Sequence, residues 1–193
     1  MAPSLPRVGL LLDAPVLPRW AHRIVWQLAG GESAELAVVV RNAAPRRAAR
    51  RPSAFRAWEA LDRRFFRAPN DYAEGVAASP LLERAPFLEI APLRRGGFDV
   101  FDAKDVEALR AFDLDVLLQL GFGPLEGEVL GAARHGVWCF AHDDLARRGV
   151  PPLAWELLWG DDATETRLAA HTPGGRRVHQ RSLAATGRNS LDG

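Results

Sequence analysis

The sequence has few of the residues that several kinds of functional site require. Cys139 is the only cysteine among 193 residues, which excludes an intrachain disulfide and a metal centre built from several thiolates. The 25 lysine and arginine residues include one lysine, Lys104, and they nearly balance 24 acidic residues. The resulting net charge of +1 gives no electrostatic reason to expect a nucleic-acid partner. No metal site is expected.

Long apolar runs are also missing. No run approaches the roughly 18 residues that a membrane-spanning helix needs, so no membrane span is expected. The apolar stretch near the N-terminus is too short for a signal peptide and is interrupted by Asp13. A cytoplasmic protein is therefore expected. No G-x-G-x-x-G motif follows the first apolar run, so the sequence does not indicate a nicotinamide-dependent enzyme.

The residues that are present are typical of a folded globular domain, with 48% hydrophobic and 25% charged residues. Val8–Leu12 and Leu36–Val40 are short runs rich in Val and Leu, which indicates two buried strands. Between them, apolar residues recur at helical spacing from Leu17 to Leu28. This β-α-β order predicts a parallel sheet with a right-handed crossover.

Later segments continue the pattern and close it with a hairpin. We predict helices at 53–66 and Ala103–Ala111, strands at Phe87–Ile90 and Phe98–Val100, a loop at Pro92–Gly97, and hairpin strands at Thr164–Ala170 and Val178–Leu183 around the turn Thr172–Gly175. The predicted fold class is α/β, a Rossmann-like open and mostly parallel sheet with helices on both faces and a C-terminal β-hairpin. One domain is predicted over 1–183, and 184–193 is predicted to be a flexible tail or the start of a linker.

One stretch combines structural and chemical signals. Leu114–Leu120 is an apolar run that ends at Gly121 and Gly123, and it predicts a buried parallel strand. A helix is predicted at Pro124–Arg134, with the proline at its start. The next apolar run leads directly to His142. We therefore place His142 at the carboxyl end of an inner strand, where open α/β sheets bind ligands.

This stretch resembles the signature region of the formyltransferase N-terminal domain, whose members act on methionyl-tRNA, glycinamide ribonucleotide and sugar amines. The family pattern is an aromatic-Gly pair, a Leu-Pro pair, Gly, Asn-x-His, Arg-Gly, Pro, Trp and Gly. The chain carries the matching residues in the same order: Phe122-Gly123, Val129-Leu130, Gly136, His142, Arg148-Gly149, Pro152, Trp159 and Gly160. A divergent branch related to the bacterial glucosamine inositolphosphorylceramide transferase-like proteins is similar over most of the chain. In that branch a larger domain follows, which implies a C-terminal partner domain.

The resemblance implies a one-carbon transferase that uses 10-formyltetrahydrofolate to formylate an amine. In the family an Asn, a His and an Asp carry the reaction, and His142 falls on the histidine. Phe140 stands at the asparagine, and Pro173 is the best match for the aspartate. A phenyl ring and a proline cannot supply the hydrogen bond and the carboxylate, so the site is expected to be degenerate. Asp144 is the acidic residue that the resemblance retains beside His142.

The catalytic candidates are therefore His142 and Asp144, and the substrate-binding candidates are Phe122, Gly123, Phe140, Arg148 and Gly149. Arg148 suits an anionic group such as phosphate, or else it faces solvent in a loop. Two main interpretations stay open. The chain is a folate-dependent formyltransferase of the sugar-amine kind, or it is a non-catalytic module, without a cofactor, that binds a nucleotide-sugar or a glycolipid head group. An unrelated small α/β binding protein is the third alternative.

Overall fold

The computed structural model describes residues 4–45, 74–142 and 160–185, together with Ser53, Ala57, Ala60, Leu61, Arg64 and Phe65. Most of the helix predicted at 53–66 lies outside the described residues, as do Asp144, Arg148 and Gly149. Within the described residues no helix is long and apolar enough to cross a membrane.

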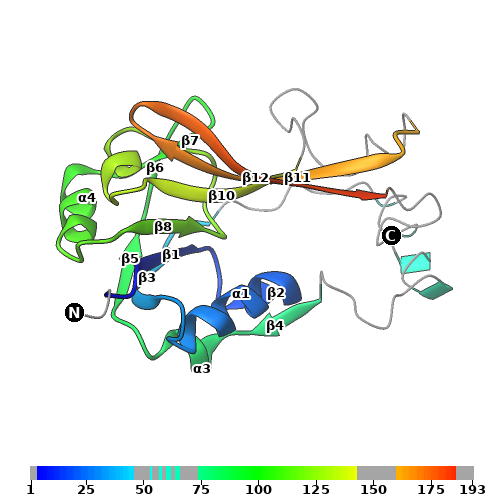
Figure 1. The fold of residues 1–193 in the computed structure, drawn as a ribbon, viewed down its shortest axis with the longest axis horizontal. Coiled ribbons are helices and arrows are strands. Elements are labelled where there is room, and N and C mark those ends of the chain that lie inside the picture. The colour runs from blue at the N-terminus through cyan, green and yellow to red at the C-terminus, as the bar shows by residue number, and fades with distance from the viewer. Residues whose placement is uncertain are drawn as a thin grey trace.

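A seven-stranded sheet forms the centre of the molecule (Figure 1). Five strands are parallel and two antiparallel strands extend the sheet at one side. Across the sheet the order is β12 (Gly175–Ala185), β11 (Ala163–Thr172), β10 (Val137–His142), β8 (Val116–Gln119), β1 (Arg7–Leu12), β3 (Glu35–Asn42) and β5 (Phe87–Ile90). The predicted fold class is confirmed.

The inner strands are apolar because both of their faces are covered. On one face α1 (Arg19–Ala29) inserts Ala21 and Val25 among residues that include Leu10 and Val39. On the other face α4 (Ala103–Arg110) inserts Val106 and Leu109 among residues that include Leu11 and Val38. Each fully buried leucine or valine contributes about 1.5–3 kcal/mol relative to exposure.

Asp102 is the N-cap of α4. Its carboxylate accepts a hydrogen bond from the Asp105 amide at 2.8 Å, which satisfies one of the unpaired amides at the start of the helix. Asp105 itself lies in the first turn, where burial is the main cause of its raised pKa and the Asp102 charge is the second. The two acids together fix the start of the helix that covers this face.

The helix predicted at Pro124–Arg134 is wrong. The segment forms β9 (Leu125–Glu126) and a short 3₁₀ turn, η1 (Glu128–Gly131). Gly127 adopts φ +88°, which a continuous helix does not allow. The segment instead pairs with β7 (Phe98–Val100) in a small second sheet, so strand pairing overrides the helical pattern. That sheet also contains β6 (Leu93–Arg95), where the sequence predicted only a loop.

A third, two-stranded sheet joins β2 (Val16–Pro18) to β4 (Gly75–Ala77), and the one-turn α3 (Ser79–Leu82) follows. The C-terminal hairpin is confirmed, although its strands are longer than predicted. Its register shifts once, because Ala169 pairs with Val178 while Leu168 pairs with Gln180. His179 is therefore the extra residue of a β-bulge. Figure 1 shows the hairpin reaching beyond the parallel strands.

Candidate functional site at the carboxyl end of the sheet

The carboxyl ends of β1 and β8 form the switch point of the sheet. From β1 the chain continues to β3 and β5 on one side, and it later returns to β8 and β10 on the other. Loops that leave two adjacent parallel strands in opposite directions create the crevice in which such folds bind ligands. Here the two loops are formed by Asp13 after β1 and by Gly121–Gly123 after β8.

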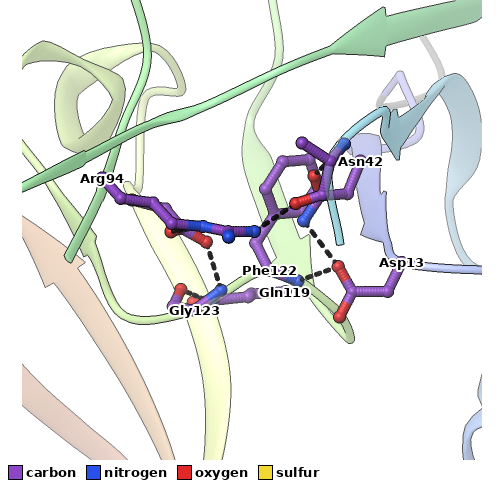
Figure 2. A network of polar contacts seen from close by, with 8 residues as sticks. Asp13, Asn42, Arg94, Gln119, Phe122 and Gly123 are labelled. Carbon is purple, nitrogen blue, oxygen red and sulfur yellow. Dashed lines mark hydrogen bonds and ion pairs between the residues drawn. The ribbon is translucent and has the colours of Figure 1, made fainter. Parts of the chain in front are cut away.

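A polar network closes the crevice at this point (Figure 2). The Oδ1 atom of Asp13 accepts hydrogen bonds from Nδ2 of Asn42 at 2.7 Å and from the amide of Phe122 at 2.9 Å. Asn42 is only 2% exposed, and its Oδ1 accepts a hydrogen bond from the Ala44 amide at 3.0 Å. The Asp13 carboxylate thus links the ends of three adjacent parallel strands.

A second part of the network holds Gly123 from both sides. Asp99 is fully buried, and its Oδ2 accepts a hydrogen bond from the Gly123 amide at 2.6 Å. Nε2 of Gln119 donates to the Gly123 carbonyl at 2.7 Å. The Arg94 guanidinium lies 3.8 Å from Asp99 and also donates to the carbonyl of Ala44. The polar backbone groups of Gly123 are thus engaged within the protein.

The backbones of the two loops touch. A Cβ atom on Gly121 would lie 2.3 Å from the amide nitrogen of Asp13, so only glycine fits there. The next residue, Phe122, has φ +66°, an uncommon conformation for a non-glycine residue. Its ring packs against Phe101 with centroids 5.2 Å apart. Phe122 and Gly123, two predicted substrate-binding residues, are therefore brought to the switch point, where Phe122 uses its ring for packing.

The neighbouring strand β10 carries the other described candidates. The half-buried ring of Phe140 meets the Trp20 ring of α1 edge to face, with centroids 5.7 Å apart and planes at 74°. His142 is the last residue of β10 and pairs with Thr166 of β11. The backbone of His142 thus lies at the carboxyl end of an inner strand. The roles predicted for His142, Asp144, Arg148 and Gly149 stay predictions.

Pro173 lies at the opposite end of the same strand pair. It occupies the turn after β11, beyond the pair formed by Val137 and His171, and its ring packs on Gly131. It lies seven positions beyond Thr166, the partner of His142, which is about 23 Å along an extended strand. The structure does not bring Pro173 to the end of β10 that His142 occupies.

The only cysteine is not an activated nucleophile. Cys139 pairs with Gln119 on one side and with Ala169 on the other. Burial raises the pKa of its thiol, and the Arg176 charge opposes this effect only in part. The thiol is therefore protonated at neutral pH. Across the described ranges, no three His, Cys, Asp or Glu side chains converge as metal ligands would.

A cavity of about 360 Å³ opens beside this network, on the α1 face of the sheet. Its apolar wall includes Leu12 and Phe87, and its polar wall includes Arg41 and Glu83. The Arg41 guanidinium stacks over the Phe87 ring at 5.1 Å and forms an ion pair with Glu89. The volume lies in the range of small-molecule sites, which are mostly apolar with a few polar groups.

Sequence reasoning missed Asp13, Asn42, Asp99 and Arg41 as site residues. A usable signal was present for three of them, because Asp13 directly follows β1 while Arg41 and Asn42 end β3. Polar residues at the carboxyl ends of adjacent parallel strands meet in space. Asp99 had no such signal, since it comes from the small second sheet.

The strand order and the helices that cover both faces of the sheet define a doubly wound α/β protein. No protein-family model matches the sequence, and no curated protein matches it. Solved structures do match it. Glycinamide ribonucleotide transformylase 1 from Geobacillus kaustophilus has a TM-score of 0.61 at 14% identity, over 98% of this chain and 87% of that one. The enzyme of the same name from Symbiobacterium toebii has a TM-score of 0.58 at 16% identity, over 94% and 74%.

A formyltetrahydrofolate deformylase from Pseudomonas putida KT2440 matches with a TM-score of 0.60 at 11% identity. That match covers all of this chain, which spans 59% of the deformylase. The chain therefore has the fold of the formyltransferases, as the resemblance implied. At these identities the likeness establishes the fold, and the chemistry depends on the residues of this chain.

Proposed function

We propose that this chain is a degenerate formyltransferase-fold module that binds an amino sugar linked to phosphate, as in nucleotide-sugars and glycolipid head groups. The observation that carries the proposal is the Phe140 ring, which stands where the family has an asparagine and packs edge to face on Trp20. Formyl transfer creates an oxyanion that needs positioned hydrogen-bond donors. A phenyl ring offers none, and its packing partner fixes it in a structural role.

The position of Pro173 supports the same proposal. It is the best sequence match to the family aspartate, yet it lies at the far end of the strand pair and carries no carboxylate. The residues at the two positions therefore do not fit formyl transfer from 10-formyltetrahydrofolate. In the proposed function the chain uses no cofactor. A C-terminal partner domain, a cytoplasmic location and the relation to the ceramide-transferase branch remain part of the proposal.

The cavity beside β1 and β3 is the proposed binding site. Arg41 is its cation, already oriented over Phe87, and a guanidinium binds phosphate with two parallel hydrogen bonds. The Glu83 carboxylate and the Ser79 hydroxyl lie in the same lining and are suited to accept hydrogen bonds from sugar hydroxyl and amine groups. The apolar wall excludes water from the sugar ring.

Two measurements test the proposal. Purified protein supplied with 10-formyltetrahydrofolate and a UDP-amino sugar is expected to release no tetrahydrofolate and no formate. Turnover that disappears in His142→Ala would show an active enzyme and overturn the degenerate interpretation. Calorimetry with UDP-glucosamine and with glucosaminyl inositol phosphate then distinguishes nucleotide-sugar from lipid head group as the ligand.

The binding site is tested with a matched pair of variants. Arg41→Gln is expected to weaken sugar-phosphate binding at least tenfold, because a charge-assisted contact is lost. Arg23→Gln removes the same charge from an exposed position on α1 and is expected to leave binding unchanged. Equal losses in both variants, or none in either, would refute the assignment to this cavity.

A further inference from the structure

A second hollow lies on the hairpin side of the sheet, away from the carboxyl-end cavity. Its volume is about 650 Å³, and β10, β11, β12 and the turn between the hairpin strands line it. Trp138, Ala170 and Arg177 are paired in register across three strands. Ala170, in the middle, contributes only a methyl group to the floor of the hollow. Gly174 and Gly175 leave the end near the turn open. Large side chains therefore surround a space that no side chain fills.

The β-bulge of β12 gives this hollow an aromatic wall. His179 is the unpaired residue of the bulge, and its ring lies 4.7 Å from the Trp138 ring at a tilt of 31°. Bulges redirect a side chain relative to the regular alternation of a strand. The Trp138 indole is itself held, since its Nε1 donates to the His135 carbonyl at 3.1 Å. The Trp138 and His179 rings therefore form an ordered stack, and the outer ring, His179, is exposed to solvent.

The charged groups of the hollow all have one sign. Its lining among the described residues contains Arg134, Arg176 and Arg177, together with His135 and His179, and no carboxylate. The Arg134 guanidinium forms an ion pair with the Asp115 carboxylate at 2.8 Å. Among the described residues, no carboxylate forms an ion pair with Arg177. The whole chain has nearly equal numbers of basic and acidic residues, so this separation of charge is local.

We infer that this hollow is a second binding site, which takes a nucleoside phosphate. The base extends the stack formed by Trp138 and His179, and the phosphate binds the guanidinium groups of Arg177 and Arg134. Base stacking on aromatic side chains is worth about 1–3 kcal/mol, and arginine binds phosphate through paired hydrogen bonds. The volume suits one small molecule. A nucleic-acid strand would need a longer basic track than one hollow supplies.

The test is calorimetry on the full chain at low salt, with AMP, adenosine and inorganic phosphate as probes. AMP is expected to bind at least tenfold more tightly than either fragment, because it alone engages both the rings and the arginines. Arg177→Gln and His179→Ala are each expected to weaken AMP binding about tenfold, from the lost charged hydrogen bonds and the lost stacking respectively.

Arg23→Gln is the matched control. Arg23 is exposed on α1 and does not line the hollow, so its loss is expected to change AMP binding by no more than about threefold, from screened charge alone. Equal binding of AMP and phosphate would show that the Trp138 and His179 rings do not contribute to binding, and this would overturn the inference. AMP binding that falls with Arg41→Gln but not with Arg177→Gln would assign the ligand to the carboxyl-end cavity, and this also overturns it. Failure of the formyl or sugar assays leaves this inference unaffected.

Discussion

The carboxyl end of the parallel sheet and the hairpin differ in how their polar groups are satisfied. At the carboxyl end of the sheet, Asp13, Asn42 and Asp99 are partnered by other groups of the protein, and two of the three are almost completely buried. On the hairpin, Arg177 and His179 are exposed around an open hollow. Buried polar groups must be paired, whereas exposed ones are free to bind something else. The closed network therefore maintains shape, and the open hollow is available to a ligand.

This difference predicts two kinds of mutational effect, one on stability and one on binding. Changes within the closed network are expected to cost stability, and changes in the hollow are expected to cost binding alone. The first two of the following predictions test the first half of that statement, and two further stability effects follow in decreasing order.

Replacement of Gly121 by alanine is expected to destabilise the protein by about 3 kcal/mol, at the upper end of the cost of overpacking. The new Cβ would lie 2.3 Å from the Asp13 amide nitrogen and 2.6 Å from the Leu12 carbonyl carbon, so backbone must move. Urea unfolding measures the loss. Gly174→Ala is the control, because its Cβ meets only an ordinary contact at 3.8 Å. Similar midpoints for the two variants would show that the loops are not locked together.

Removal of the Asp13 carboxylate is expected to cost about 2 kcal/mol in Asp13→Ala. The substitution leaves Nδ2 of the buried Asn42 and the Phe122 amide without their acceptor. Asp13→Asn retains an oxygen in the same place and is expected to cost about half as much or less by the same reasoning on neutral hydrogen bonds. If both variants unfold at the wild-type urea concentration, the network contributes nothing to stability.

The contact between Trp20 and Phe140 is expected to contribute about 1 kcal/mol of coupling, the usual value for an aromatic pair. A double-mutant cycle with Trp20→Leu, Phe140→Leu and the double variant isolates that energy in thermal or urea unfolding. Additive losses would mean that Phe140 is not held by Trp20. Its role as a packing residue in place of a hydrogen-bond donor would then lose its support.

The smallest expected effect concerns His171 of β11, which pairs with Val137 and with Arg176. Burial is the main cause of its lowered pKa, and the nearby Arg176 charge adds to it. The unfolded chain therefore binds a proton more readily than the folded protein below the usual value of 6.5. Stability is expected to fall as the pH decreases from 6.5 towards the folded pKa, and to be insensitive to this group above that range.

His171→Gln is expected to reduce this acid sensitivity slightly, as measured by urea unfolding at about pH 5 and about pH 7.5, below and above the usual histidine pKa. A proton NMR titration of the His171 ring gives the folded pKa directly. A titration midpoint above 6.5 would contradict the prediction and would reverse the sign of the stability change.

Much of the fold could be predicted because the inner strands are covered on both sides. Near-continuous apolar runs such as Val8–Leu12 have one structural solution in an α/β chain, and the helix predicted from Ala103 begins at that residue in α4. Pro124–Arg134 was mispredicted because its structure depends on pairing with β7, a partner more than 20 residues earlier in sequence. Local periodicity carries no information about such a partner.

The site was harder to predict from the sequence for a similar reason. His142 and the Gly121–Gly123 turn were found from strand ends alone, whereas the Asp99 contact with Gly123 joins residues 24 positions apart through a buried carboxylate. The hollow depends on a bulge at His179, and a bulge changes which face a side chain occupies without changing the sequence pattern. Resemblance supplied the fold, but the geometry decided which candidate residues meet.

The hairpin has one more consequence, for how copies of this protein coexist in a crowded solution. In the described part of the chain β12 is the outermost strand, and an outermost strand with vacant amides and carbonyls is a template for polymerisation. Three arginines and an irregular step in the pleat lie along it, which repels and misaligns a second β12. The basic side chains that surround the hollow thereby also oppose the edge-to-edge strand pairing that leads to fibres.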